Sequence, residues 1–165
     1  YIPQRGVLFS GTIESNLRYA DENATDDMLA SAIDIAQVTE FVNSKQEGMG
    51  AEISQSGANV SGGQNQRLSI ARALVGNPPI YIFDDSFSAL DFKTDSSLRR
   101  ALKKKTGDST VLIVTQRVAT VKNADQIVVL DQGRVVGKGK QHELLQTCET
   151  YREIAYSQLS KEELV

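Results

Sequence analysis

The chain has 165 residues, of which 40% are hydrophobic and 24% are charged, and this balance is typical of one ordinary globular domain. Its single cysteine, Cys148, excludes an internal disulfide and a multi-cysteine metal cluster, and it fits a reducing compartment such as the cytosol. The net charge of −3 argues against a general attraction to nucleic acid or to an anionic membrane surface. The longest apolar runs, of about four to six residues, are far shorter than the roughly 20 that span a bilayer.

The chain begins in what is predicted to be the end of a strand. Residues 1–4 contain no initiating methionine, so we expect the sequence to be part of a longer domain. Next, residues 26–43 carry apolar side chains at helical intervals, and Thr25 with the two following aspartates can cap the start. The inward positions are Leu29, Ala32, Ile33 and Ala36. The pattern predicts one helix over residues 26–43.

A second helix is predicted over residues 64–75. The polar and glycine-rich residues 45–57 lead towards it as a loop, and a turn at residues 61–63 precedes it. Its inward positions are Leu68, Ala71, Leu74 and Val75. The Gly-Asn-Pro-Pro run at residues 76–79 is predicted to end this helix.

The rest of the chain predicts an α/β layer. Apolar runs at residues 80–83 and 111–114, separated by a helix over 93–105, indicate two parallel strands in a sheet covered on both faces. A strand at 126–130 and residues 134–136 are predicted to form a closing hairpin. Residues 141–157 are predicted to be helical, with these side chains inward: Leu144, Leu145, Tyr151 and Ile154.

Two local patterns have candidate chemistry. Asp84 and Asp85 end an apolar strand, where carboxylates can hold Mg²⁺ and orient water, although this pattern alone also describes a solvated strand end. Glycines at a helix start leave N–H groups that bind anions, although the same residues form an ordinary tight turn: Ser61, Gly62, Gly63 and Gln64. A cluster of cations near residue 105 is interpreted as a solvated helix face: Arg99, Arg100, Lys103, Lys104 and Lys105.

The order and spacing of these patterns resemble the ABC ATPase family over nearly the whole chain. Residues 60–64 look like its signature motif, residues 80–84 like the Walker B strand, residues 88–91 like the D-loop, and Gln4 like the Q-loop glutamine. The resemblance implies a P-loop NTPase-like (RecA-like) α/β fold, with a mostly parallel sheet, helices on both faces and an inserted α-helical subdomain.

The resemblance also implies a domain division. Residues 1–17 would end a RecA-like core and carry the Q-loop, and residues 18–77 would form the α-helical subdomain with the signature motif. Residues 78–141 would return to the core with Walker B, the D-loop and the switch loop, and residues 142–165 would form a C-terminal helical segment.

Two segments are similar to those of exporters within the family. Residues 8–13 resemble the segment after the Q-loop, and residues 51–57 stand at the position of the X-loop. Glu52 and Gly57 match the X-loop, whereas Ser54, Gln55 and Ser56 replace a glycine, an acid and a base. The resemblance implies that Gln4 and Glu52 couple the domain to membrane-spanning domains.

The sequence departs from the family at three places. No Gly-x-x-x-x-Gly-Lys-Ser/Thr run occurs, so the P-loop (Walker A) is missing. Asp85 stands where the family has a catalytic glutamate, and it is one methylene shorter. Gln116 stands at the switch histidine and has no titratable proton. The only histidine, His142, lies at a predicted helix start, where a surface role is expected.

The resemblance implies ATP and Mg²⁺ as ligands, with a second nucleotide-binding domain and transmembrane domains as partners. Asp84 and Gln4 are expected near the metal, the residues of the signature motif near the partner's ATP, and Asp91 at the dimer interface. Because Asp85 and Gln116 are degenerate whereas the signature is nearly intact, we expect one subunit of a heterodimeric exporter at the cytoplasmic face of the membrane.

Two other functions remain open from the sequence. The chain could belong to a soluble ABC ATPase that acts on nucleic acid or translation, although its charge and its exporter-like segments disfavour a nucleic-acid partner. It could also be a binding module without activity. Residues 1–165 alone are expected to be inactive, because they lack the loop that holds the phosphates.

Overall fold

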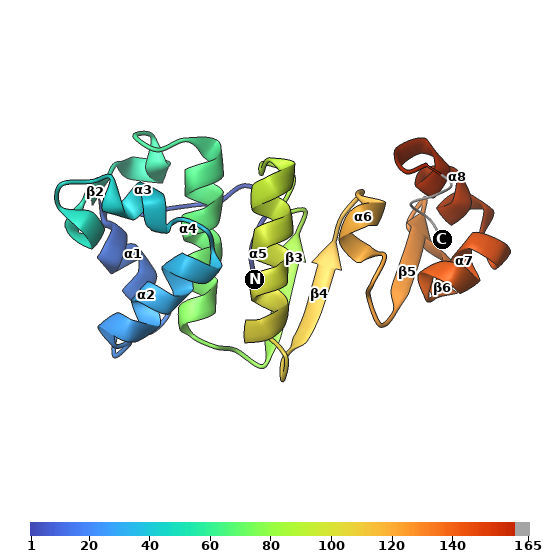
Figure 1. Cartoon of the computed structure of the whole chain (residues 1–165), viewed down its shortest axis with the longest axis horizontal. Coiled ribbons are helices and arrows are strands. Elements are labelled where there is room, and N and C mark those ends of the chain that lie inside the picture. The colour runs from blue at the N-terminus through green and yellow to red at the C-terminus, as the bar shows by residue number, and fades with distance from the viewer. Residues whose placement is uncertain (161–165) are drawn as a thin grey trace. The chain divides into compact units, whose positions relative to one another are not determined.

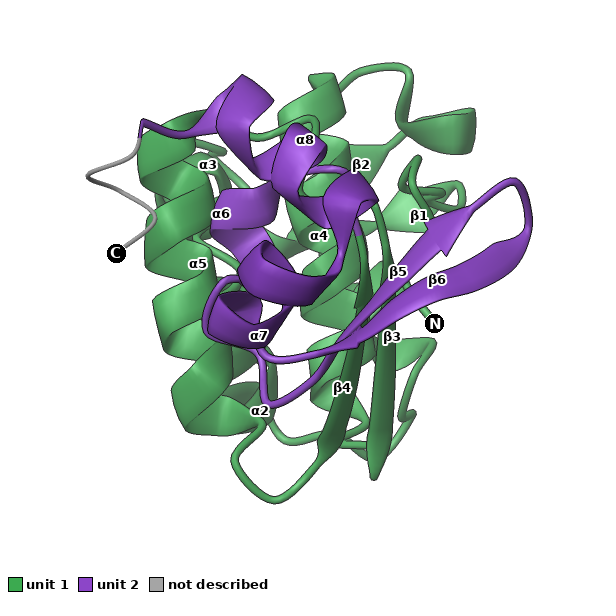
Figure 2. Ribbon diagram, turned by 90° about the vertical axis from the view of Figure 1, so that its right-hand side faces the viewer, with its two compact units in different colours: residues 1–114 green, residues 115–165 purple. Residues whose placement is uncertain are grey.

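The computed structural model describes residues 1–160, which divide into two compact units (Figure 2). The first unit is Tyr1–Val114 and the second is Thr115–Val165, of which the structure describes residues up to 160. Each unit has its own cluster of buried hydrophobic side chains.

The helices before the first strand of the sheet share one core. Their bounds are α1 (Ile13–Arg18), α2 (Asp26–Ile35), α3 (Thr39–Asn43) and α4 (Gly62–Val75). The predicted cap is confirmed, because the Thr25 hydroxyl accepts a hydrogen bond from the Met28 N–H at 3.3 Å. All eight inward positions predicted for residues 26–43 and 64–75 are buried.

The single helix predicted over residues 26–43 is wrong, because the chain leaves the helix at Ala36. Gln37 adopts a left-handed φ of 57°, and its N–H bonds the Asp34 carbonyl at 2.9 Å. The Val38 N–H reaches back to the Ile33 carbonyl at 3.1 Å, which completes a Schellman ending with Ile33 and Val38 both buried. Glycine or asparagine usually takes this left-handed position, so the glutamine gave no sequence signal.

A short ladder joins the loop before α1 to the segment before α4. Strand β1 (Gly11–Thr12) pairs antiparallel with β2 (Glu52–Ile53). Two 3₁₀ turns, Gly48–Gly50 and Gln55–Gly57, flank β2 within the predicted loop. The loop of residues 45–57 is therefore more ordered than its polar composition predicts.

The predicted parallel sheet is confirmed in the first unit. Strand β3 (Ile80–Asp84) pairs in parallel register with β4 (Thr110–Val114), and α5 (Phe92–Lys105) connects them. Ile2 forms a parallel bridge to Phe83 on the other edge of β3, as expected for the end of a strand. Figure 1 shows α5 running alongside this strand pair, with α4 beyond it.

The two sides of β3 differ in exposure. Tyr81 and Phe83 are 1% exposed and share the core with the helices, whereas Ile82 is 36% exposed. On β4, Leu112 and Val114 are 51% and 53% exposed. Within the first unit, one face of this strand pair packs on the core, and the other face carries the more exposed apolar side chains.

The second unit consists of a hairpin and helices. Its elements are α6 (Val118–Val121), β5 (Ile127–Asp131), β6 (Arg134–Gly139), α7 (Gln141–Thr147) and α8 (Glu149–Gln158). The predicted hairpin is confirmed, and its turn uses positive φ angles at both Gln132 and Gly133.

The single helix predicted over residues 141–157 is wrong at Cys148, which is buried and extended, with φ −119° and ψ 108°. The new helix that follows presents Tyr151 and Ala155 to the core. Ile154, predicted to face inward, is 37% exposed. The buried side chains on the two sides of the break nevertheless keep helical spacing: Leu144, Cys148, Tyr151 and Ala155. Residues 161–165 lie outside the described part of the chain.

Candidate functional site

The carboxyl end of β3 brings three predicted site residues together. The Gln4 Nε2 donates a hydrogen bond to the Asp85 Oδ2 at 3.0 Å. The Tyr1 hydroxyl donates to the Asp84 Oδ2 at 2.9 Å, and this hydrogen bond to a carboxylate raises the pKa of the Tyr1 phenol. Because ligands bind beyond the carboxyl ends of parallel strands, this edge is the expected place for a metal and phosphates.

The backbone holds Asp85 in an unusual conformation. Asp85 has a φ of 45°, and its N–H continues the sheet by donating to the Val114 carbonyl at 2.8 Å. Its carbonyl accepts from the Ser88 hydroxyl at 2.8 Å. The fully buried Ser86 donates to the Ile2 carbonyl at 2.8 Å, which fastens the Gln4 segment to the same strand end. These hydrogen bonds therefore fix the backbone turn that carries the Asp85 carboxylate at the end of β3.

The start of α4 is the second part of the candidate site. The Ser61 hydroxyl accepts from the Gln64 N–H at 3.2 Å, and the Gln64 Oε1 accepts from the Ser61 N–H at 2.9 Å. This capping box uses the N–H groups of Ser61 and Gln64. The N–H groups of Gly62 and Gly63 lie in the first turn, where a helix offers them no carbonyl acceptor. A Cβ on Gly62 would meet no atom within 4 Å, so this helix start is open to a ligand. The arrangement fits an anion.

A buried glutamine that sequence reasoning missed connects these two parts. Gln66 is 1% exposed, and its Oε1 accepts from the Gly6 N–H at 2.7 Å while its Nε2 donates to the Pro3 carbonyl at 3.1 Å. Further along α4, Arg72 donates to the Val7 carbonyl at 2.7 Å. The sequence of α4 holds several polar residues, and nothing in it distinguishes Gln66 from the others.

Asp91 and Glu52 belong to other elements, the start of α5 and strand β2. Asp91 caps α5, since its carboxylate accepts from the Thr94 N–H at 3.0 Å and from the Thr94 hydroxyl at 2.6 Å. These hydrogen bonds lower the pKa of the Asp91 carboxyl. Glu52 is exposed in β2, and its carbonyl accepts from the Asn59 side chain at 2.8 Å.

Gln116 belongs to the second unit. Its side chain is exposed, and its carbonyl accepts from the Gln158 Nε2 at 2.7 Å. The Gln158 Oε1 accepts from the Val118 N–H at 3.0 Å, so one side chain of α8 holds the backbone on both sides of Arg117. No motif or periodicity in the sequence indicates these two hydrogen bonds.

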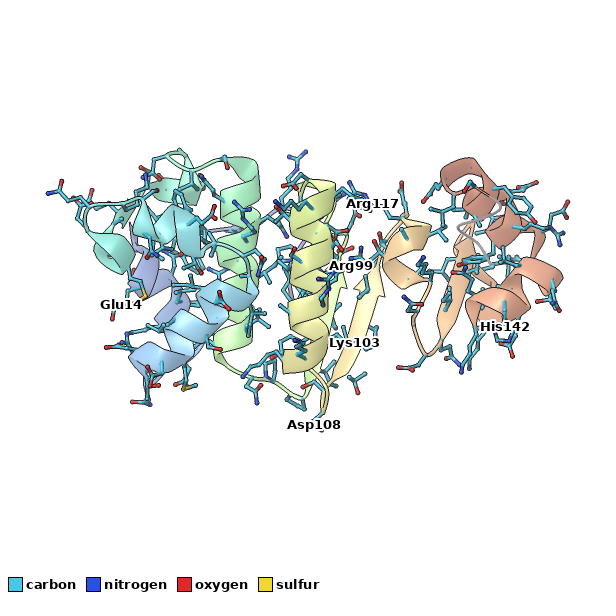
Figure 3. The ribbon with its side chains drawn as sticks, in the orientation of Figure 1. Glu14, Arg99, Lys103, Asp108, Arg117 and His142 are labelled. Carbon is cyan, nitrogen blue, oxygen red and sulfur yellow. The ribbon has the colours of Figure 1, made fainter. Side chains whose placement is uncertain are left out.

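Other candidate groups carry no comparable arrangement. His142 is exposed on α7, and the cations Arg99 and Lys103 project from α5 (Figure 3). Arg99 pairs with the buried Asp95 at 3.0 Å. Over residues 1–160, no group of three or more His, Cys, Asp or Glu side chains is placed to hold a metal ion. Within the same residues, we find no helix whose length and apolar character would let it cross a membrane.

The chain was compared with known proteins. The sequence profile of the family described as "ABC transporter" matches residues 1–88. An uncharacterized ABC transporter ATP-binding protein of Mycobacterium tuberculosis is 45% identical over 160 residues, which are 95% of this chain and 27% of that protein. A putative export ATP-binding/permease protein of Rickettsia conorii is 37% identical, covering 97% of this chain and 28% of that protein.

The structural comparison agrees. The structure of a bacterial Atm1-family ABC exporter with ATP bound superimposes with a TM-score of 0.90 and 33% identity, covering 97% of this chain and 28% of that one. The chain thus spans 27% to 28% of the length of these relatives. The predicted P-loop NTPase-like fold is confirmed, and the chain belongs to the ABC transporter family.

Proposed function

We propose that this chain is part of the ATP-binding domain of an ABC exporter and forms the degenerate half of a heterodimer. The observation that carries the proposal is the hydrogen bond between Gln4 and Asp85 at the carboxyl end of β3. This hydrogen bond joins an amide and a carboxylate at the strand end, which supports the binding of a nucleotide and its metal at this edge. The relatives named as export ATP-binding/permease proteins support an exporter over a soluble ATPase that acts on nucleic acid or translation.

The strand edge suits Mg²⁺ bound together with a nucleotide. Mg²⁺ takes one or two carboxylates and completes its shell with water and phosphate oxygens, so a cluster of three protein acids is not required. Asp84 and the Gln4 amide supply oxygens of the right chemistry at the end of β3. In our proposal Asp84 and Gln4 bind the metal, which would neutralise phosphate charge.

The same edge is poorly equipped for hydrolysis. Asp85 already shares a hydrogen bond with Gln4, and its carboxylate is one methylene shorter than the glutamate of the family. Gln116 can contact a phosphate but cannot accept and return a proton at neutral pH. We propose that the ATP bound at this edge is hydrolysed slowly.

The start of α4 serves a different nucleotide in this proposal. Ser61, Gly62, Gly63 and Gln64 would contact the ATP held by a second nucleotide-binding domain, which supplies its own catalytic residues. The capping box supports this role because it presents the glycine N–H groups as a rigid anion site. Asp91 would lie at the interface of the two domains, near the signature, since a Cβ on Gly63 would lie 3.7 Å from the nearby Ala89 carbonyl.

We further propose the four-part division given by the resemblance, with residues 1–17 and 78–141 in the core, 18–77 as the helical subdomain and 142–165 as the C-terminal segment. Gln4 and Glu52 would transmit movement to transmembrane domains. The exporter-type relatives support this arrangement and a position at the cytoplasmic face of a membrane.

The experiment is to express the natural protein that contains this chain and to separate membranes from the soluble fraction. We expect Mg²⁺-dependent ATP hydrolysis in the membrane fraction, together with a second, different ATP-binding chain that copurifies. A homogeneous soluble ATPase that binds RNA would refute the exporter. A membrane homodimer with two equally active sites would refute the heterodimer.

A further inference from the structure

The segment of residues 3–9 is fixed along one face of α4. Contacts occur at Gln66, at Ser69 and at Arg72, which follow one another at helical spacing on that face. Arg72 donates to the Val7 carbonyl, and its guanidinium lies 5.2 Å from the centre of the Phe9 ring. The segment and the helix therefore share an extended set of contacts.

The closest approach lies at Gly6. A Cβ on Gly6 would lie 2.6 Å from the Asn65 Oδ1, 2.6 Å from the Ser69 Oγ and 2.9 Å from the Asn65 carbonyl. Only a glycine backbone fits against α4 at this distance. The segment thus lies directly on the helix, with no room for a side chain between them.

Gln66 makes the specific connection at this approach. The Pro3 carbonyl can only accept a hydrogen bond and the Gly6 N–H can only donate one, so the pair requires a side chain that does both. An amide of glutamine length meets this requirement. The two bonded groups flank Gln4, so the segment that carries Gln4 is held on both sides.

Gln66 also lies close to the signature. It stands five residues after Ser61, which corresponds to about 7.5 Å along the helix axis. A rigid helix transmits a displacement over this distance without bending. The Gln4 segment and the start of α4 should consequently move as one body.

We infer that Gln66 is a positioning residue for ATP hydrolysis, because it locks the Gln4 segment to the signature helix. This inference rests on the proposed function. The amide of Gln66 is buried and bonded to the Gly6 N–H and the Pro3 carbonyl, so Gln66 would act through Gln4 at one site and Ser61 at the other. A displacement of the Gln4 segment would then displace the start of α4, and the reverse.

The first test measures amide hydrogen exchange in the natural protein. Gln66→Leu removes both hydrogen bonds at similar side-chain volume, and Gln66→Glu retains an acceptor for the Gly6 N–H. Ser69→Ala is the matched control, since it alters the same face of α4 at a buried hydroxyl for which residues 1–160 offer no hydrogen-bond partner. We expect Gly6 exchange to rise about tenfold in Gln66→Leu and to stay within about twofold in Ser69→Ala.

The second test measures ATP hydrolysis by the same proteins with their partner domain. We expect kcat to fall about tenfold in Gln66→Leu with KM for ATP within about twofold, because misplacement below 1 Å impairs chemistry more than binding. Gln66→Glu should lie between Gln66→Leu and the unaltered protein. A loss of fold alone would instead lower the amount of active protein. The kcat per folded molecule would then not follow this graded order.

Unchanged Gly6 exchange in Gln66→Leu would overturn the inference, and so would kcat values for both Gln66 variants equal to that of Ser69→Ala. If Gln66→Leu does not fold, kcat decides, because Gln66→Glu keeps the acceptor for the Gly6 N–H and loses only the donor to the Pro3 carbonyl. A kcat of Gln66→Glu equal to that of Ser69→Ala would then overturn the inference. If the unaltered protein hydrolyses no ATP, the proposed function fails, and the exchange test alone decides whether Gln66 locks the segment.

Discussion

The contact of Gly6 with α4 gives a stability prediction that can be worked from distances. In Gly6→Ala, the new Cβ would stand about 0.8 Å inside the 3.4 Å limit of ordinary contact with two side-chain oxygens. It would also press on the Asn65 carbonyl at 2.9 Å, which is helix backbone and cannot rotate away. The segment must then lift from the helix and weaken the Gln66 bond to the Gly6 N–H.

Overpacking of this kind costs about 1–3 kcal/mol. With a urea m value of about 2 kcal/mol/M, the midpoint of unfolding should fall by about 0.5–1.5 M. Gly107→Ala is the control, because a Cβ there meets nothing within 4 Å and the φ is not positive. It should leave the midpoint unchanged or raise it slightly. Equal midpoints for the two variants would refute the close packing of the segment on α4.

Two further predictions concern helix caps. Thr25→Ala removes the hydroxyl that accepts from the Met28 N–H, so the free energy of unfolding should drop by about 1 kcal/mol in urea titrations. The control Ser31→Ala, on the exposed face of α2, should leave the free energy of unfolding unchanged. Equal effects of the two variants would exclude the cap. The Asp91 carboxyl should titrate by NMR below its ordinary pKa of 3.8, and Thr94→Val should raise that pKa. Because the pKa is lower in the folded state, this carboxylate stabilises the fold above pH 3.8, and the contribution disappears as the pH falls through the folded pKa. If Thr94→Val leaves the pKa of Asp91 unchanged, the assignment of these hydrogen bonds is contradicted.

The regular elements were predictable because their signals are local. The apolar runs that became β3 and β4 and the periodic positions of α4 follow from burial alone. The break at Gln37 was not predictable, since glutamine does not favour a left-handed φ, and the break at Cys148 was not predictable, since no glycine, proline or asparagine marks it. Both breaks are instead imposed by tertiary packing, which places Val38 and the Cys148 side chain in the core.

The candidate site was predictable only in part. Asp84 and Asp85 follow a recognisable strand, and Gln4 was assigned through the resemblance to a family. Their contact could not be derived from the sequence, because 81 residues separate Gln4 from Asp85. Gln66 and Gln158 were missed for a related reason: each bonds to backbone groups, which have the same chemistry at every position along the chain.

The central claim is that the signature of this chain serves the partner's ATP, while its own strand edge hydrolyses slowly. The most direct measurement compares Ser61→Arg with Asp85→Asn in the natural protein assembled with its partner. We predict that Ser61→Arg lowers the rate of ATP hydrolysis by at least about tenfold, because a long cation blocks the anion site at the start of α4. Asp85→Asn should retain at least about half of the rate. Hydrolysis that survives Ser61→Arg but is lost in Asp85→Asn would contradict the account.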